Sequence, residues 1–456
     1  RVLQFGTGRL LRGLCADVFA RANDDPSVPW EGSVVAVQST GHHRADAINH
    51  RDGRFHLRVR GIRSGSRIDE TREVTEPSIA LAAERDWSRV LAVAREPALD
   101  LIISNTTEAG LRVPEHPEQI DGPDAPRSFI GKLLAVLTER ARTYPDRPLT
   151  IVPCELLESN GALLRKAVLS HATACRADAA AAAWIAGHVR FADSLVDRIC
   201  TAPGIDDDPL DTVVEPYALW AIRDPDGATG PLAFCADPDP GKSTDRSAIS
   251  AETDTRARAS VHADIDPFYQ RKIRVLNGAH IAVVHLGLLA GLGTGGYLEE
   301  LLEREILPAL EHDGIGGGEA FAAEVLDRFA NPFLAHALAE IEKGSAQKVG
   351  IRLAPTVIAH RARTGRPPAL IALAFAGWAE RTRRTLLTQP GMNSALGSDI
   401  TSPLVEAVER PGAFASALFG TVAHRFEGSL DGETVREAAE AIESAGAEQA
   451  IDRALG

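Results

Sequence analysis

Short β-branched runs alternate with stretches of helical periodicity through the N-terminal half of the chain. Strands are predicted at "RVLQFG" (1–6), "SVVAVQ" (33–38), "LDLIISN" (99–105) and "PLTIVPCEL" (148–156), and helices near 9–22, 85–95, 127–143 and 160–174. Because strands separated by helices usually pair in parallel, this pattern predicts a doubly wound α/β sheet.

Further strand-like pieces follow the first ones. Polar and apolar residues alternate around a Gly-Ser turn over 54–76, which predicts a hairpin inserted after the second strand. The segments 188–199 and 211–224 are also strand-like and would extend the sheet or cap it.

The pattern changes after residue 235. "CADPDPGKSTDRSAISAETD" (235–254) is rich in Pro, Asp and Ser and looks like a connection between domains. From about 264 onward the periodicity is helical almost throughout. We therefore expect an α/β domain over 1–240 and a mostly α-helical domain over 255–456.

Composition narrows the classes of function. The net charge of −14 argues against a nucleic-acid partner, and no run reaches the roughly 18 apolar residues that a membrane helix needs. Five cysteines without CxxC spacing suggest neither a disulfide framework nor a zinc site, so we expect a cytoplasmic protein. No HExxH motif occurs, and the histidines of "GHHR" (41–44) are interpreted as a loop pair, so no metal is expected.

A glycine pair follows the first predicted strand. In "LQFGTGRLLRG" the residues Gly6, Thr7 and Gly8 stand between a strand and a helix, where glycines let the backbone approach a pyrophosphate. Leu11 stands where the third glycine of GxGxxG would be, so the match is partial. The position still predicts a Rossmann-like domain that binds a dinucleotide at this turn.

The end of the second strand bears on which dinucleotide is bound. Gln38 stands where an acidic residue would hold the ribose of NAD. The following residues Ser39, Thr40 and Arg44 could bind a 2′-phosphate. We expect NAD as the cofactor, and NADP is not excluded.

The run "RKIRVLNGAHIAVVHLG" (271–287) places a lysine at the head of an apolar segment. Lysines number only six among 49 basic residues, and lysine, unlike arginine, can lose its proton near neutral pH when desolvated. On an α-helix over 266–289, Lys272, His280 and Asn277 fall at about 0°, 80° and 140° and can face one side. They could serve as general acid or base, orienting group and alkoxide donor. The alternative is a snorkelling lysine, an asparagine at a helix break and a core histidine.

"KIRVLNGAH" resembles the K-x4-N-x2-H signature of the mannitol dehydrogenase family. The segments "LQFGTGRLLR" (3–12), "SNTTEAGL" (104–111), "PCELLESNGALLR" (153–165), "VDRI" (196–199) and "RFANPFLAHAL" (328–338) agree in order and spacing. The resemblance implies a metal-independent dehydrogenase in which Lys272 is the acid–base and Asn277 and His280 assist. It also suggests that Thr106 and Glu108 of "SNTTEAGL" lie at the cofactor.

Different segments resemble different branches of that family. "QFGTGRLLR", "SNTTEAGL" and "PCELLESNG" resemble the branch that interconverts tagaturonate and altronate, "EPYALWAIRD" (215–224) the mannitol and fructuronate branch, and "FADSLVDRI" (191–199) the mannitol-1-phosphate branch. Members that act on free polyols carry asparagine where Asp193 stands, so Asn277 would stabilise the alkoxide alone or Asp193 would point elsewhere.

A keto-sugar acid also requires a site for its carboxylate. Lys348 and Arg352 lie four residues apart, adjacent on one helical face, and could bind it, although a solvated helix face is the alternative.

The expected function is therefore NAD(P)-dependent reduction of a keto-sugar acid of the tagaturonate type. The alternatives are a polyol 2-dehydrogenase, a hexitol-phosphate dehydrogenase, and a catalytically inactive nucleotide-binding sensor on the same scaffold. The oligomeric state and the sugar stereochemistry stay open.

Overall fold

The computed structural model describes residues 1–28, 30–204, 208–235, 259–290, 295–333, 342, 345–388 and 402–455. Their contacts divide the chain into two compact units. The first unit holds the described residues from Arg1 to Asp266 together with Ala330–Phe333, and the second holds those of Pro267–Phe329 and those from 342 onward. Of the predicted connection over 235–254, only Cys235 belongs to the described residues, so the predicted domain limits stay predictions.

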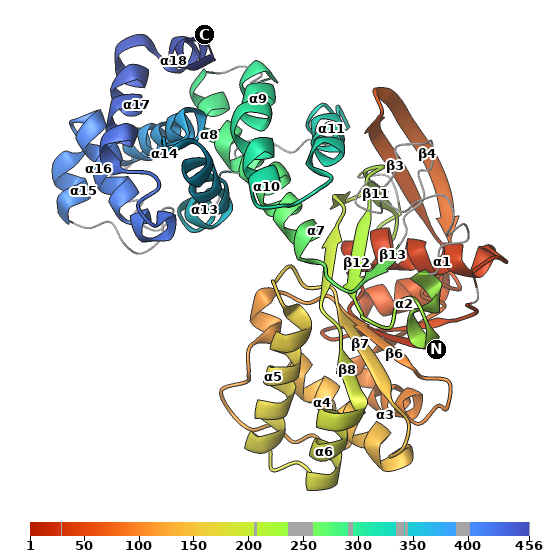
Figure 1. The fold of residues 1–456 in the computed structure, drawn as a ribbon. Helices are drawn as coiled ribbons and strands as arrows, with labels where there is room; N and C mark the ends of the chain where they lie inside the picture. Colours follow the sequence, from red (N-terminus) through yellow and green to blue (C-terminus); the bar gives the residue numbers. More distant parts are fainter. Residues whose placement is uncertain are drawn as a thin grey trace. The chain divides into compact units, whose positions relative to one another are not determined.

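A six-stranded parallel sheet forms the centre of the first unit (Figure 1). Its order is β5-β2-β1-β6-β7-β8, with β1 Val2–Phe5, β2 Val34–Gln38, β5 Ile79–Ala82, β6 Leu101–Ser104, β7 Leu149–Pro153 and β8 Val189–Phe191. The parallel pairings confirm the predicted doubly wound sheet. Phe5 pairs with Val37 on one side and Ser104 on the other, so the carboxyl ends of β1, β2 and β6 are neighbours.

Both faces of this sheet are buried. Leu3 and Phe5 pack with the helices of one face, which are α3 (Ala83–Ala94), α4 (Phe129–Thr143), α5 (Asn160–Ala174) and α6 (Ala179–His188). Val2 belongs to the opposite face, where it packs with the π-helical segment η1 (Leu11–Cys15) and with α1 (Ala16–Asp24). Successive residues of a strand face opposite sides, which explains why these strands are almost continuously apolar.

Two smaller sheets complete the first unit. The predicted hairpin is confirmed: β3 (Phe55–Arg63) and β4 (Ser66–Val74) pair antiparallel, in one sheet with β10 (Cys200–Thr201) and β11 (Thr212–Val214). The other sheet contains β9 (Ser194–Asp197), β12 (Leu219–Arg223) and β13 (Ala259–His262), next to the 3-10 turn η3 (Gly230–Cys235). The predicted strand over 188–199 is thus divided, because β8 extends the central sheet while β9 joins a smaller one.

The prediction that 41–44 is only a loop is wrong. The helix α2 (His43–His50) begins within it. Ala45 and Ile48, three residues apart, are fully buried against β5 and the hairpin, which gives this mostly polar segment a helical core face.

Helices make up the second unit, as predicted. Its first described helix runs without a break through α7 (Asp266–Arg271), the π-helical segment η4 (Lys272–Gly278) and α8 (Ala279–Ala290). The others are α9 Gly295–Leu301, η5 Leu302–Ile306, α10 Leu307–His312, α11 Gly318–Phe329, α13 Ser345–Thr364, α14 Ala369–Thr388, α15 Ser402–Ala407, α16 Pro411–Gly420, η6 Ala423–Phe426, α17 Gly432–Ala445 and α18 Ala447–Leu455. Helix α14 contacts α8, α16 and α17 and so forms the centre of the packing.

The helix Asp266–Ala290 is long and apolar enough to cross a membrane by length and composition. Of its most apolar window, however, 67% is buried inside the protein. A core helix has the same properties, so the helix by itself does not indicate a membrane span.

Candidate functional site

The turn after β1 is built for close backbone approach. Gly6 has a φ of +118°, and a Cβ there would lie 2.8 Å from Leu11 Cδ1 and 3.1 Å from the Asn105 carbonyl oxygen. Only glycine satisfies both constraints. A Cβ at Gly8, by contrast, would meet no atom within 4 Å. The space at Gly8 is open, and it adjoins the N-terminus of the helix that begins at residue 9.

Arg12 braces this turn from inside the protein. Its Nη1 donates to the Thr7 carbonyl oxygen at 2.5 Å and its Nε to the Leu210 carbonyl oxygen at 3.0 Å. Burial, followed by the charges of Arg44 and Arg9, lowers the pKa of Arg12 to about 10, so the guanidinium stays protonated near neutral pH. Thr7 itself is buried and contributes its backbone to the turn.

The third glycine of the motif lies later than expected. Leu11 is fully buried and fills the space beside Gly6. Gly13 instead permits the close helix-to-strand approach, since a Cβ there would lie 2.7 Å from Cys200 Sγ and 2.8 Å from Val214 Cγ1. Reasoning from the sequence did not single out Gly13, although a glycine two residues beyond the expected position was the available signal.

The motifs "SNTTEAGL" and "PCELLESNG" are joined by hydrogen bonds at the carboxyl ends of β6 and β7. Asn105 Nδ2 donates to the Cys154 carbonyl oxygen at 2.6 Å, and the Thr106 N–H donates to Glu155 Oε1 at 2.9 Å. Burial raises the pKa of the Glu155 carboxyl. Thr106 is therefore held next to the turn of β1. Glu108 begins the 3-10 turn η2 (Glu108–Leu111), and its side chain lies outside the described residues.

Asn160 joins the same edge to the neighbouring sheet. Its buried Nδ2 donates to the carbonyl oxygens of Pro153 at 3.0 Å, Glu155 at 3.0 Å and Ser194 at 2.9 Å, and its Oδ1 accepts from the Ser194 N–H at 2.9 Å. The asparagine of "PCELLESNG" thus positions the loop after β7, a role that the sequence alone did not indicate.

Asp193 lies at the N-terminus of α5. Its Oδ1 accepts from the N–H groups of Gly161 at 2.9 Å and Ala162 at 3.2 Å, and its Oδ2 lies 3.4 Å from Arg223 Nη1. An anion at a helix N-terminus is favourable. These contacts account for both carboxylate oxygens within the first unit, and direct contact of Asp193 with a substrate stays a prediction.

The side chain of Gln38 is committed to the loop that follows β2. Its Nε2 donates to the Thr40 carbonyl oxygen at 2.8 Å, and its Oε1 accepts from the Ala45 N–H at 2.9 Å. Glu84 holds the same loop, because its Oε1 accepts from the Gly41 N–H at 3.2 Å. Gln38 therefore shapes the loop where a ribose reader was expected.

Lys272, Asn277 and His280 share one helix in the second unit, but the assumed α-helical periodicity is wrong for it. Residues Lys272–Gly278 form a π-helical segment with i→i+5 bonds, so an α-helical wheel does not describe their directions. All three side chains are partly exposed, whereas residues 274–276 between them are buried. The ring of His280 stacks on Phe329, with centroids 4.3 Å apart and 21° between the planes.

The two candidate carboxylate ligands lie on a helix that packs against this segment. A Cβ at Gly278 would lie 3.3 Å from the Arg352 carbonyl oxygen, so α13 approaches η4 closely. Lys348 and Arg352 are both partly buried, and burial, with the charge of Arg352 as a further cause, lowers the pKa of Lys348. Burial also lowers the pKa of Arg352, and among the described residues no carboxylate pairs with it.

Within the described part of the chain, no group of three or more His, Cys, Asp or Glu side chains could hold a metal ion. The residues around Gly6 and Gly8 fit a dinucleotide, since an open cradle, a helix N-terminus and exposed arginines meet at one sheet edge.

Comparison with known proteins gives consistent matches along the chain. Residues 1–233 match the model of the mannitol dehydrogenase Rossmann domain, and residues 264–385 match that of the mannitol dehydrogenase C-terminal domain. The chain is similar to the altronate oxidoreductase of Bacillus subtilis, with 30% identity over 401 residues covering 82% of this chain and 78% of the relative. It is 32% identical over 406 residues to that of Halalkalibacterium halodurans, covering 82% and 74%.

Two solved structures share the fold. A crystal structure of D-sorbitol dehydrogenase in substrate-free form has a TM-score of 0.74 at 21% identity, covering 99% of this chain and 94% of the other. The ternary complex of Pseudomonas fluorescens mannitol 2-dehydrogenase with NAD and D-mannitol has a TM-score of 0.67 at 21% identity, covering 100% and 94%.

Proposed function

The chain belongs to the mannitol dehydrogenase family and is a dehydrogenase or reductase acting on a CH–OH group, and we propose that it interconverts tagaturonate and altronate with NAD as the cofactor. The named relatives support the sugar-acid substrate, because both are altronate oxidoreductases. In the direction of reduction, hydride and a proton add across the C=O bond of the keto-sugar acid.

The coenzyme is assigned to the turn of β1. Gly6 and Gly8 would hold its pyrophosphate, with Thr7 and Leu11 shaping the turn and Thr106 at the adjoining strand end. When bound, the nicotinamide supplies or accepts the hydride. The open space at Gly8 supports this assignment, since the protein alone does not need a glycine there.

The second unit supplies the proton and holds the oxygen. Lys272 donates a proton to the carbonyl oxygen that becomes the hydroxyl, and the Asn277 amide stabilises the developing alkoxide. His280, whose ring is held by stacking on Phe329, orients the sugar hydroxyls. Because all three belong to one helix, their mutual spacing is preserved.

The observation that carries the substrate assignment is the cationic pair on α13. Lys348 and Arg352 lie near one another and partly buried, and Arg352 lacks a carboxylate partner among the described residues. A partly desolvated guanidinium without a counterion is costly, and the carboxylate of a sugar acid would relieve that cost. A neutral polyol would not.

Initial rates with NADH and tagaturonate, fructuronate, fructose or fructose 6-phosphate test this proposal. We expect tagaturonate to give the highest kcat/KM, and fructose to be poor because it has no carboxylate. Equal or faster reduction of fructose would favour a polyol dehydrogenase, fructose 6-phosphate as the best substrate would favour a hexitol-phosphate dehydrogenase, and NADH binding without any turnover would favour a sensor.

We also propose that the protein works in the cytoplasm. All five cysteines are free, and three of them are buried, which agrees with a reducing cytoplasm. Under the proposed function, its binding partner is the small sugar-acid substrate.

A further inference from the structure

Two exposed arginines follow the carboxyl ends of β1 and β2. Arg9 begins the helix after Gly8, and Arg44 lies in the first turn of α2, just beyond the end of β2. Both side chains are exposed, and within the described ranges neither forms an ion pair. Arg9 directly follows Gly8, and Arg44 directly precedes Ala45, whose N–H is bound by Gln38 at the end of β2, so both arginines stand at the edge where β1 and β2 end side by side. Their charges also contribute to the lowered pKa of Arg12.

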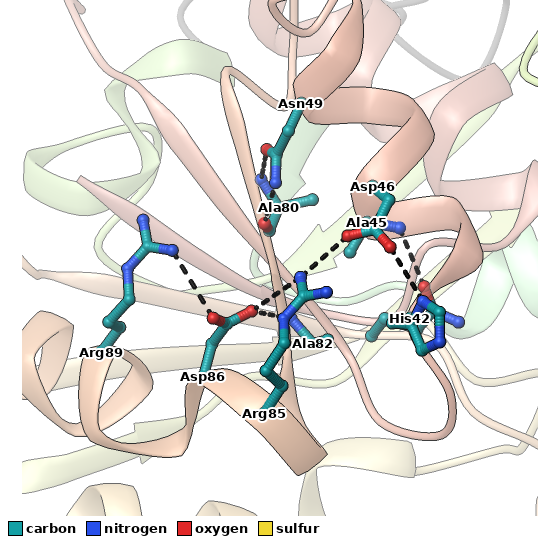
Figure 2. A network of polar contacts seen from close by, with 10 residues as sticks. His42, Ala45, Asp46, Asn49, Ala80, Ala82, Arg85, Asp86 and Arg89 are labelled. Carbon is teal, nitrogen blue, oxygen red and sulfur yellow. Dashed lines mark hydrogen bonds and ion pairs between the residues drawn. The ribbon is translucent and has the colours of Figure 1, made fainter.

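Two carboxylates of the same loop region, those of Asp46 and Asp86, are already paired with neighbouring cations. Figure 2 shows Asp46 between His42 and Arg85, with 2.8 Å to His42 Nδ1 and 2.8 Å to Arg85 Nη2. Asp86 lies 3.3 Å from Arg85 Nη2 and 3.7 Å from Arg89 Nη1 in the same network. Hydrogen bonds to arginine and histidine lower the pKa of Asp46, so the pairing persists at neutral pH.

Neutral Gln38 leaves the end of β2 without the acid that repels a phosphate. Its amide is bonded to Thr40 and Ala45, so it cannot turn to read a ribose hydroxyl without releasing the loop. Two charged side chains reach this region from α3: Glu84, whose carboxylate accepts from the Gly41 N–H, and Arg85, which is paired with Asp46. Positive charge therefore exceeds negative charge where the adenosine ribose would lie.

We propose that Arg44, assisted by Arg9, binds the 2′-phosphate of NADPH, so that this enzyme uses NADPH as well as NADH. The inference rests on the proposed function only in placing the dinucleotide at the β1 turn. A guanidinium group can donate two parallel hydrogen bonds to phosphate oxygens. Ser39 and Thr40, whose hydroxyls can also donate to a phosphate, lie between Gln38 and Arg44 in the sequence.

Binding measurements on the full chain test the proposal independently of turnover. Dissociation constants of NADH, NADPH, 5′-ADP and 2′,5′-ADP would be measured by calorimetry or fluorescence. We expect NADPH to bind within about tenfold of NADH, and 2′,5′-ADP to bind more tightly than 5′-ADP. Arg44→Ser should weaken NADPH and 2′,5′-ADP by roughly tenfold to a hundredfold, and NADH by less than about threefold.

Two further variants separate a specific contact from general charge. Arg89→Ser removes one exposed cation from the neighbouring helix and should leave the NADPH-to-NADH ratio unchanged. Glu84→Gln removes the carboxylate beside Gly41 and should improve NADPH binding. The affinity for NADPH should also fall more steeply with added NaCl than the affinity for NADH.

The possible failures are distinguishable. NADH binding with NADPH more than about a thousandfold weaker, or an Arg44→Ser variant that binds NADPH as the unaltered chain does, would overturn this inference alone. Failure to bind either nucleotide would overturn both the inference and the assignment of the β1 turn.

Discussion

Gly278 of η4 lies against the backbone of Arg352 in α13: a Cβ on the glycine would be 3.3 Å from the Arg352 carbonyl oxygen. Two candidate parts of the substrate site, the Lys272 to His280 segment and the cationic pair of α13, are thereby packed together within the second unit. Their spacing does not depend on the first unit. Substrate chemistry and sugar-acid recognition should thus be separable by mutation from coenzyme binding.

Replacement of Lys272 tests the acid–base assignment. Lys272→Ala should lower kcat by roughly a hundredfold to ten-thousandfold, because the carbonyl oxygen loses its proton donor, while the dissociation constant of NADH stays near that of the unaltered chain. Lys272→Arg should not restore turnover, since guanidinium does not release a proton near neutral pH. If the arginine variant keeps more than about half of the activity across the pH range, Lys272 acts only through its positive charge, and the acid–base assignment is wrong.

The glycines of the coenzyme turn should respond differently to substitution. Gly8→Val should leave the thermal unfolding temperature nearly unchanged, because the position is open, and should weaken NADH binding at least tenfold by filling the space for the pyrophosphate. Gly6→Ala should instead destabilise the fold by roughly 1–3 kcal/mol, since its φ is positive and Asn105 leaves no room. If Gly8→Val binds NADH normally, the dinucleotide lies elsewhere.

Arg352 should determine the preference for a carboxylate. Arg352→Gln should raise KM for tagaturonate roughly tenfold to a hundredfold, with a smaller change in kcat, because a charged hydrogen bond is lost. Its effect on fructose should be slight, since fructose lacks the carboxylate. Arg363→Gln, an exposed position near the end of the same helix, is the matched control and should change neither substrate. Equal losses for both substrates would point to a structural role.

Glu305 predicts a pH dependence of stability in the second unit. Its buried carboxyl accepts the N–H groups of Leu370 at 2.8 Å and Ile371 at 2.9 Å, yet burial dominates and raises its pKa to about 7. Because the folded-state pKa lies above the unfolded-state value, the folded state binds this proton more tightly. The resulting stability is fully present below the unfolded pKa and is lost as the pH rises through about 7. Between pH 5 and pH 8.5, ionisation of Glu305 should therefore lower the free energy of unfolding by up to about 3 kcal/mol.

Denaturant unfolding of the unaltered chain and Glu305→Gln at both pH values isolates this contribution. Glutamine cannot titrate, so the variant should lose less stability than the unaltered chain across the interval. Parallel losses in the two proteins would show that other groups control the pH dependence.

Part of this protein follows from its sequence without tertiary information. The alternation of β-branched runs with helical periodicity predicted a parallel, doubly wound sheet, and the structure has it. The helical second unit followed from periodicity in the same way. These features depend on neighbouring residues in the chain, which is why local pattern was sufficient.

Other features were decided only when distant segments came together. Gln38 stands where a ribose reader is expected, but Thr40 and Ala45 occupy its amide, and Asp193 finds its partners 32 and 31 residues away at Gly161 and Ala162. The π-helical winding of Lys272–Gly278 likewise changes the directions that an α-helical wheel assigns. Residue types and their order were set by the sequence, whereas hydrogen-bond partners depend on loops and helix packing that no local pattern contains.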